Sequence, residues 1–270
     1  VYGIIELINF AHGEIYMLGA FTALLVAGVL GIVGFPAGGI LIVAALAAVV
    51  WSAAYGYTLE KVAYKPLRGA PRLSPLISAI GMSIFLQNYV LLAQTSDYVP
   101  FPRLLPEMEF LDYLGNIMGP SDFLILVTST LAMVSLSLFI RYTRMGKAMR
   151  ATAQNRKMAL LLGINADRII SLTFIVGSAL AGVLIASHMG QVNFGIGFLA
   201  GLKAFTAAVL GGIGSIPGAM VGGLVLGIAE SMTTGYLSGN YEDALAFALL
   251  ILILIFRPDG ILGKAKVQKV

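Results

Sequence analysis

The feature that most constrains this sequence is a series of apolar runs, each close to the length needed to cross a membrane. The hydrocarbon core of a bilayer is roughly 30 Å thick, which requires about 20 mostly apolar residues in a helix. The apolar residues are continuous rather than alternating, which favours helices over barrel strands. The candidate spans are residues 15–34, 38–59, 76–93, 123–140, 169–187, 198–230 and 244–256.

Composition agrees with a chain that lies mostly in lipid. Hydrophobic residues make up 59% of it and charged residues only 11%, well outside the balance of soluble domains. We therefore predict an all-α, polytopic bundle of transmembrane helices, with about seven or eight spans in one domain over residues 1–270. The chain opens at Val1 inside an apolar run without an initiator Met, so we expect that an N-terminal segment of up to one helix is missing. Cysteine is absent, which excludes disulfides and thiolate metal sites.

Lysine and arginine gather in three segments, which predicts the orientation in the membrane. Residues 60–74, 141–168 and 257–270 hold 15 of the 17. Positive loops are retained on the cytoplasmic side, so we expect these segments inside the cell and the acidic connection 94–122 outside. An even number of crossings must then separate the second and third basic segments, which requires the run 198–230 to turn back. The alternative, one long helix with a flexible kink, would place the tail outside.

Two segments interrupt the apolar pattern with glycine, proline and polar residues. The first is INFAHGEIYMLG (8–19), and the second is LGGIGSIPGA (210–219), which we interpret as the turn of a broken or re-entrant helix pair. Such interruptions leave backbone N–H and C=O groups without a hydrogen-bond partner in the helix. A membrane protein tolerates these groups only where they are buried in protein or line a water-filled cavity. Such paired interruptions indicate a transport pathway. The pathway candidates are Asn9, Phe10, His12, Gly13, Glu14, Gly211, Ile213, Gly214, Ile216 and Pro217.

Ordinary structural roles stay open for the polar members of the first segment. Glu14 in a first helical turn would be stabilised by unpaired N–H groups, by about 0.3–1 kcal/mol. His12 has no second histidine or carboxylate at helical spacing, which favours a hydrogen-bonded role over proton transfer. After the second segment, small residues at spacings of four predict close helix packing. These residues are Gly218, Gly222, Gly223 and Gly227.

A basic, regularly patterned stretch, GKAMRATAQNRKMALLLGINADR (146–168), lies between two apolar runs. We predict one helix over residues 147–162, about 24 Å long, which Gly163 ends in a left-handed conformation. Asn165 is placed to cap the following helix. This elbow, residues 146–168, could receive force from a separate motor, because the chain has no G-x-x-x-x-G-K-[ST] motif of its own. A basic helix lying on anionic lipid is the alternative. The apolar stripe expected on the helix is Ala148, Ala151, Met158 and Leu162.

The segment RATAQNRKMALLLGINADRI resembles the cytoplasmic loop by which permeases of ATP-binding-cassette importers dock on their ATPases. Four further segments resemble, more narrowly, the LivH-type permeases of high-affinity branched-chain amino acid importers. The resemblance covers essentially all 270 residues. Glu6 departs from it, since the family usually has a small or apolar residue there, and we assign Glu6 no role. The four segments are INFAHGEIYMLGA, YKPLRGAPRLSPLISAIGMSIFLQNYV, LKAFTAAVLGGIGSIPGAMVGGLVLGIAES and FRPDGILGK.

The resemblance implies a non-enzymatic permease domain in a bacterial inner membrane, with residues 141–168 as its ATPase-coupling loop. The implied partners are a homologous second permease, two cytoplasmic ATP-binding subunits and an external solute-binding protein that delivers leucine, isoleucine or valine. ATP and Mg²⁺ would bind to the ATPase subunits, so we expect no cofactor, catalytic residue, metal ligand or nucleic acid on this chain. The implied coupling residues are Gly146, Arg150, Ala151, Gln154, Asn155, Gly163 and Ile164.

Two other classes stay open on the residues alone. A proton-coupled secondary transporter would need an ion-coupling site, for which His12, Glu14 and Glu230 are the available groups. A membrane scaffold would need no pathway, and the two interrupted segments disfavour it.

Overall fold

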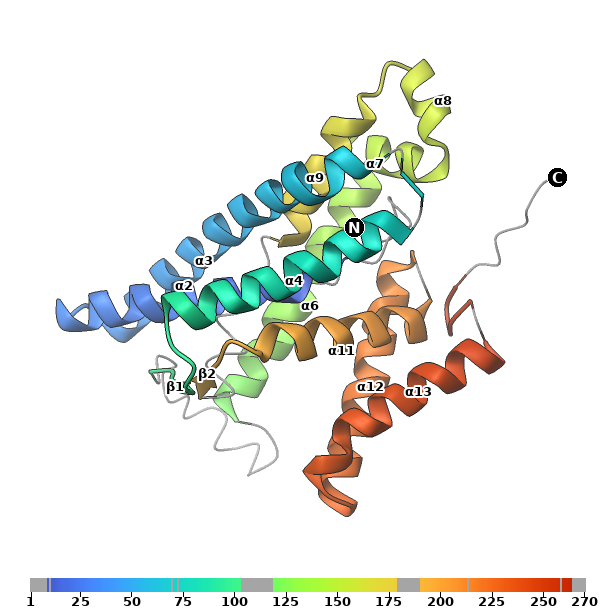
Figure 1. Cartoon of the computed structure of the whole chain (residues 1–270). Helices are drawn as coiled ribbons and strands as arrows, with labels where there is room; N and C mark the ends of the chain where they lie inside the picture. Colours follow the sequence, from blue (N-terminus) through green and yellow to red (C-terminus); the bar gives the residue numbers. More distant parts are fainter. Residues whose placement is uncertain are drawn as a thin grey trace.

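The structure, a computed structural model, is a bundle of helices of unequal length (Figure 1). It describes residues 9, 11–68, 70–71, 73–102, 119–178, 190–212, 214–257 and 259–263. The helices are α2 (His12–Ile32), α3 (Ala37–Leu59), the π-helical turn η1 (Glu60–Tyr64), the 3₁₀ turn η2 (Lys65–Leu67), α4 (Leu73–Ala93), α6 (Pro120–Tyr142), α7 (Arg144–Gln154), α8 (Arg156–Leu161), α9 (Ala166–Ser178), α11 (Ile196–Gly211), α12 (Ile216–Tyr236), the 3₁₀ turn η4 (Gly239–Tyr241) and α13 (Glu242–Phe256).

Six helices of the described part are long and apolar enough to span a membrane, which confirms the predicted all-α bundle. The predicted span 169–187 begins in α9, and its second half lies outside the described residues. The predicted run 198–230 is divided between α12 and the shorter α11, of 16 residues. The six spans are His12–Ile32, Ala37–Leu67, Leu73–Ala93, Asp122–Tyr142, Ile216–Tyr236 and Gly239–Phe256.

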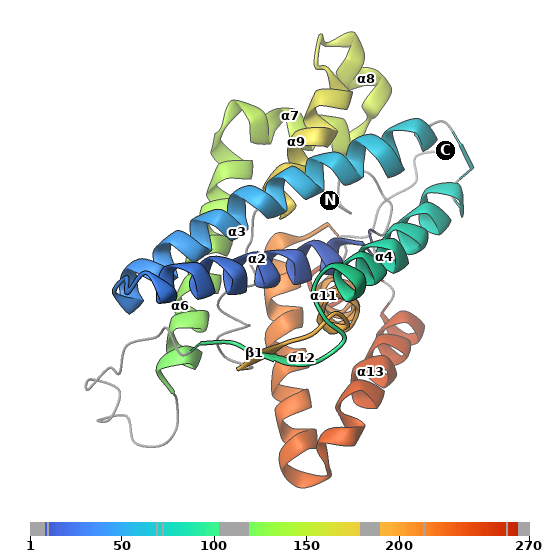
Figure 2. The same cartoon turned by 60° about the vertical axis from the view of Figure 1, so that its left-hand side comes forward.

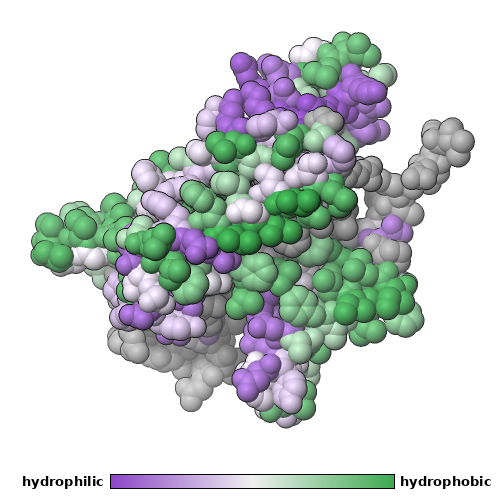
Figure 3. Space-filling model, in the orientation of Figure 1, coloured by the Kyte–Doolittle hydropathy of each residue, from purple (hydrophilic) through white to green (hydrophobic). Residues whose placement is uncertain are grey.

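Helix α2 lies at the centre of the packing. Figure 2 shows it beside α3, with α4 and α11 on its other sides. Small residues such as Ala20 and Ala23 are completely buried here, so the helices approach closely. Elsewhere large apolar side chains are exposed, for example Ile32 and Leu92, as expected for surfaces that face lipid. Figure 3 shows hydrophobic residues over much of one face and hydrophilic residues gathered over α7 and α8.

A short ribbon ties the connections together at the end of the bundle opposite α8 (Figure 1). Strands β1 (Val99–Pro100) and β2 (Gln191–Val192) pair antiparallel. The N–H of Phe101 also donates to the carbonyl oxygen of Gly190, at 2.9 Å. The ribbon fixes the segment after α4 beside the segment that leads into α11.

The interruption predicted at residues 210–219 is confirmed as the turn of a helical hairpin. Helix α11 ends at Gly211, and α12 begins at Ile216 and packs back against α11. Two glycines in the turn have positive φ, 110° at Gly212 and 87° at Gly214, a region that residues with a Cβ rarely adopt. The Ser215 hydroxyl accepts from the Gly218 N–H at 3.0 Å and so caps α12. The alternative of one kinked helix is therefore excluded.

The four glycines expected at helix contacts differ in their surroundings. A Cβ at Gly218 would overlap the carbonyl oxygen of Gly211, and one at Gly222 would overlap that of Ala207. Both glycines thus let α12 lie directly on α11. Gly223 would make only an ordinary contact with Ala207, and the space beside Gly227 is open among the described residues.

The prediction of one helix over residues 147–162 is wrong, because the chain leaves the helical conformation at Asn155. That residue is extended, with φ −159° and ψ 105°, and its side chain accepts from the Met158 N–H at 3.1 Å. The Asn155 side chain caps a new helix, so the preceding helix does not continue. Asn side chains often bond to nearby backbone groups in this way and so compete with helical hydrogen bonding. The predicted left-handed Gly163 (φ 76°) and the Asn165 cap, which accepts from the Arg168 N–H at 3.0 Å, are both confirmed.

The expected apolar stripe of the elbow is also wrong. The side chains that face inward are Met149 and Thr152 on α7 and Ala159 on α8. Met158 and Leu162 are instead exposed, at 56% and 76%. The break at Asn155 rotates α8 relative to α7, so a stripe drawn for one continuous helix does not apply.

Candidate functional site

The first interrupted segment packs tightly against α11. Gly13 lies in the first turn of α2, and a Cβ there would overlap the carbonyl oxygen of Gly197 and lie 2.8 Å from the Cα of Gly201. Only a glycine fits this contact without moving α11. At Gly13 the segment therefore meets α11 through backbone.

Glu14 is completely buried one residue later. Its Oε1 accepts hydrogen bonds from Ser83 Oγ and Gln87 Nε2 of α4, both at 2.8 Å. Its Oε2 faces Gly197 and has no hydrogen-bond partner among the described residues. The carboxyl group thus joins α2, α4 and α11, while its position in the first turn of α2 agrees with the helix-terminus role that the sequence left open.

Asn9 and His12 are partly buried beside this contact. Asn9 Oδ1 accepts from the Tyr64 hydroxyl at 2.9 Å. Asn9 Nδ2 and His12 Nδ1 are buried without a partner in the described part of the chain. Unpaired buried polar atoms are costly and uncommon, and these two mark the start of α2 as a polar site. Phe10 lies outside the described residues.

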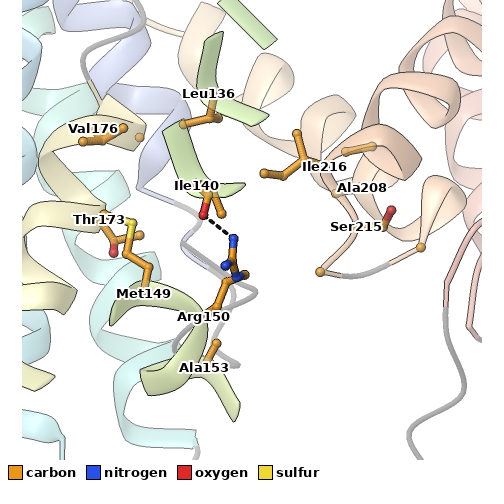
Figure 4. Close-up of a pocket in the computed structure, with 14 residues that line it drawn as sticks. Leu136, Ile140, Met149, Arg150, Ala153, Thr173, Val176, Ala208, Ser215 and Ile216 are labelled. Atoms are coloured by element: carbon orange, nitrogen blue, oxygen red, sulfur yellow. Dashed lines mark hydrogen bonds between the residues drawn. The ribbon is translucent and has the colours of Figure 1, made fainter. Parts of the chain in front are cut away.

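The second interrupted segment borders a cavity of about 310 Å³ between two groups of helices (Figure 4). Gly214, Ser215 and Ile216 line it from the α11–α12 turn, residues 212–215, and from the start of α12. Arg150 and Met149 of the elbow face them from the other side. Side chains of α6 and α9 complete a mainly apolar wall: Leu136, Ile140, Thr173 and Val176.

The structure does not bring the two interrupted segments together in one described cavity of this chain. Gly13 and Glu14 contact the beginning of α11 at Gly197, whereas Gly211 lies at its other end. Gly211 and Pro217 belong to the ends of the hairpin helices, and Ile213 lies outside the described residues. A transport pathway that both segments line stays a prediction.

The residues predicted to couple to an ATPase occupy distinct places in the elbow. Gly146 is buried where α6 turns into α7, and a Cβ there would overlap the carbonyl oxygens of Phe139 and Ile140. Arg150 Nη1 donates to the last carbonyls of α6, at Ile140 and, at 3.1 Å, at Arg141. Such a cation at a helix C-terminus satisfies otherwise unpaired carbonyl groups.

The remaining coupling residues form the outer part of the elbow. Ala151 is half-buried, and Gln154 and Asn155 are exposed at the α7–α8 junction. Gly163 turns the chain back, and the N–H of Ile164 donates to the carbonyl oxygen of Ala159 at 3.0 Å. This places the predicted set along one projecting unit.

The tip of the elbow presents an apolar surface that sequence reasoning did not single out. Leu161 is 81% exposed, and Leu162 and Met158 lie beside it. Arg156 and Lys157 flank these side chains on α8. Apolar residues at the end of a polar projection are typical of a protein contact.

Two groups of ion pairs could not be predicted from the sequence, because their members are far apart in the chain. In the first, Arg68 pairs with Glu60 and Asp167, and Asp167 pairs with Arg156 at 2.8 Å. In the second, Lys203 of α11 contacts carboxylates on two other helices. The charge of each residue was visible in the sequence, but no local spacing connects them. The carboxylates around Lys203 are Glu230 of α12 and Glu242 and Asp243 of α13.

Comparison with known proteins gives a consistent result. The family described as branched-chain amino acid transport system, permease component, matches residues 1–254. The chain is 52% identical to the high-affinity branched-chain amino acid transport system permease protein LivH of Escherichia coli, over all of the chain and 90% of that protein. It is also 52% identical, with the same coverage, to BraD of Pseudomonas aeruginosa, which has the same description.

A more distant relative is LivM of Escherichia coli, a permease protein of the same transport system. It is 30% identical over 59% of the chain and 39% of LivM. No solved structure matches the chain.

Proposed function

Because the chain belongs to the family of permease components of branched-chain amino acid transport systems, we propose that it is the membrane-spanning permease of an ATP-driven importer. Its cargo is leucine, isoleucine or valine, which it moves into the cytoplasm. It works with a homologous second permease, two ATP-binding subunits on the cytoplasmic side and an external solute-binding protein. The similarity to LivH and BraD supports this assignment, and nothing in the comparisons supports the proton-coupled alternative.

The observation that carries the proposal is the position of the elbow relative to the α11–α12 turn. Arg150 of the elbow and Gly214 of the turn line the same cavity. A displacement of the elbow would therefore act directly on the point where two membrane helices reverse. This is the connection that a transporter driven by a separate ATPase requires.

The work proposed for this chain is conformational. ATP binding would close the two ATPase subunits, push on the elbow and switch the pathway between outward-open and inward-open states. Hydrolysis takes place on the partner subunits, with ATP and Mg²⁺ bound there. A population shift of this kind needs a ligand or partner that binds one state better than the other, which is the role of the nucleotide-dependent ATPase pair.

The proposed location is the bacterial inner membrane, with the elbow in the cytoplasm. The elbow lies at the same end of the bundle as the described parts of the other two basic segments. Arg68 is ion-paired to Asp167 of the elbow, and the N–H of Ile261 in the C-terminal segment donates to the carbonyl oxygen of Leu210 beside the α11–α12 turn. This clustering supports the positive-inside orientation.

Co-purification tests the proposal. The tagged chain is expressed with the other subunits of its transport system, extracted in detergent and captured. We expect a nucleotide-binding subunit to be captured with it, and Leu161→Asp at the tip of the elbow to abolish that capture. The matched control Leu237→Asp makes the same change at an exposed residue just after α12, away from the elbow, and should leave capture unchanged. Stable capture of the ATPase by the Leu161→Asp chain, correctly inserted, would contradict the proposed contact.

A further inference from the structure

Glu60 is a charged residue in the interior of the bundle, where charged side chains are rare. It is 0% exposed and begins the π-helical turn η1 at the end of α3. One oxygen pairs with Arg68 and the other accepts from Ser171 Oγ of α9 at 2.7 Å. π-Helical turns are rare and occur frequently at functional sites. A buried ion pair is weak evidence for stability but a good means of fixing one arrangement of helices.

One face of α9 contacts this region at three points. Asp167, Ser171 and Phe174 follow at helical spacing and contact Arg68, Glu60 and Tyr64, respectively. The rings of Phe174 and Tyr64 lie 5.1 Å apart between centroids. Both views show α3 and α9 side by side (Figures 1 and 2). Any rotation or shift of α9 must therefore move the π-helical turn.

The contacts continue in both directions from α9. Toward the cytoplasmic tip, Asp167 Oδ1 accepts from Arg156 Nη2 of α8 at 2.8 Å. Toward the centre of the bundle, the Tyr64 hydroxyl donates to Asn9 Oδ1 at 2.9 Å. Asn9 lies immediately before the first turn of α2, where Gly13 and Glu14 contact α11 and α4. These contacts, joined between Glu60 and Tyr64 by the backbone of η1, connect the elbow to the polar start of α2.

Arginine 68 is suited to hold two carboxylates at once. Its planar guanidinium presents a fixed fork of donors, which a lysine cannot reproduce. Nη2 contacts Glu60 and Nη1 contacts Asp167, while only 12% of the side chain is exposed. The arginine fixes the distance between the π-helical turn and the beginning of α9.

We propose that the series Arg156–Asp167–Arg68–Glu60, continued by Tyr64 and Asn9, is the connection through which movement of the elbow reaches the start of α2. These are positioning residues: they transmit displacement and do not themselves touch ATP. The inference rests on the proposed function, because it assumes that the elbow receives force from an ATPase. It adds a second connection, independent of the cavity beside Arg150, which leads to the other interrupted segment.

The exposed end of the series offers the cleanest test. Asp167→Asn removes the charge that Arg68 and Arg156 share, and Asp167 is half exposed, so the fold should tolerate the change. The complex with its native partner subunits is reconstituted in liposomes, and leucine uptake and ATP hydrolysis are measured together. We expect leucine transported per ATP to fall about fivefold or more, with the melting temperature of the complex unchanged. The matched control Asp97→Asn makes the same change at an exposed residue between α4 and β1, away from the elbow, and should keep the wild-type ratio.

Removal of the Tyr64 hydroxyl tests the inner end of the series. Tyr64→Phe keeps the ring against Phe174 and removes only the hydrogen bond to Asn9. The ratio of leucine to ATP should fall as in Asp167→Asn. The control Tyr57→Phe removes a hydroxyl from a more exposed ring earlier in the same helix and should have no effect.

The buried pair needs a double change, because Arg68→Gln alone would leave Glu60 charged in the interior. The double variant Glu60→Gln with Arg68→Gln removes both charges together. It should assemble better than Arg68→Gln alone, but leucine transported per ATP should stay below the wild-type value. An unchanged ratio in Asp167→Asn and Tyr64→Phe would overturn the inference. So would a loss of assembled complex with a normal ratio in what remains, since that would make the series a structural contact only. If the wild-type complex shows no ATP-dependent leucine uptake, the proposed function itself fails, which is a separate outcome.

Discussion

The left-handed glycine of the elbow gives a prediction whose magnitude follows from the structure. Gly163 has φ 76°, and no heavy atom of the described residues lies within 4 Å of the position that a Cβ would take. A substitution there meets backbone strain but no steric overlap with the described part of the chain. An L-residue in this conformation costs roughly 1–2 kcal/mol, and Asn is tolerated better than most. A β-branched residue is the least compatible with positive φ.

We therefore expect a graded series at this position. Gly163→Asn should resemble the wild type, Gly163→Ala should be intermediate and Gly163→Val should be the most impaired. A cost of 1–2 kcal/mol changes the population of the native elbow by a factor of about 5–30. The reconstituted complex should then hydrolyse ATP with little leucine uptake, while capture of leucine by the solute-binding protein is unaffected.

The assay is leucine uptake per ATP hydrolysed, for variants whose insertion and assembly have been checked. Normal uptake by a correctly inserted Gly163→Val complex would refute the role of the elbow. Equal impairment by Asn and Val would refute the reasoning from φ, because it would mean that any side chain at this place obstructs the partner. The order of the series, rather than one variant, is the critical result.

Three further predictions concern packing, charge and sidedness. Gly13→Ala should lower stability by about 1–3 kcal/mol through overpacking against α11, seen as a lower melting temperature in detergent. Gly28→Ala, where none of the described residues lies close to the added Cβ, should leave the melting temperature unchanged, and equal melting temperatures for the two variants would contradict the contact. Lys203→Met should cost about 1–3 kcal/mol, because three carboxylates lose the cation that they share, and an unchanged melting temperature would contradict this. In this cysteine-free chain, Gly239→Cys should react with an impermeant thiol reagent from outside intact cells, and Leu161→Cys should not. The reverse labelling pattern would mean that the chain has the opposite orientation in the membrane.

The spans and turns could be predicted because their signals are local. Continuous apolar runs located the membrane helices, and the glycines and proline near residue 214 indicated the hairpin. Gly163 and Asn165 followed from the chemistry of helix ends. Each of these signals depends on a few neighbouring residues and on the solvent that surrounds them.

The features that were missed depend on contacts between distant segments. Asn155 was read as one polar residue in a helix, since its capping geometry is apparent only when the backbone turns. Arg68 was counted only as one charge of a basic segment and Glu60 was not singled out, because their partner Asp167 lies about 100 positions further along the chain. Gly13 was expected in a wet pathway, and the structure places it against the backbone of Gly197, a contact that no local pattern predicts.

The most direct test of the account is transport by the purified complex in sealed liposomes. The chain is reconstituted with the second permease, the ATP-binding subunits and the solute-binding protein, with ATP supplied on the side of the elbow and radiolabelled leucine on the other. We predict that leucine accumulates only when hydrolysable ATP is present, and that dissipating a proton gradient leaves the rate unchanged. Accumulation that needs no ATP and stops when the proton gradient is dissipated would contradict the assignment of this chain to an ATP-driven importer.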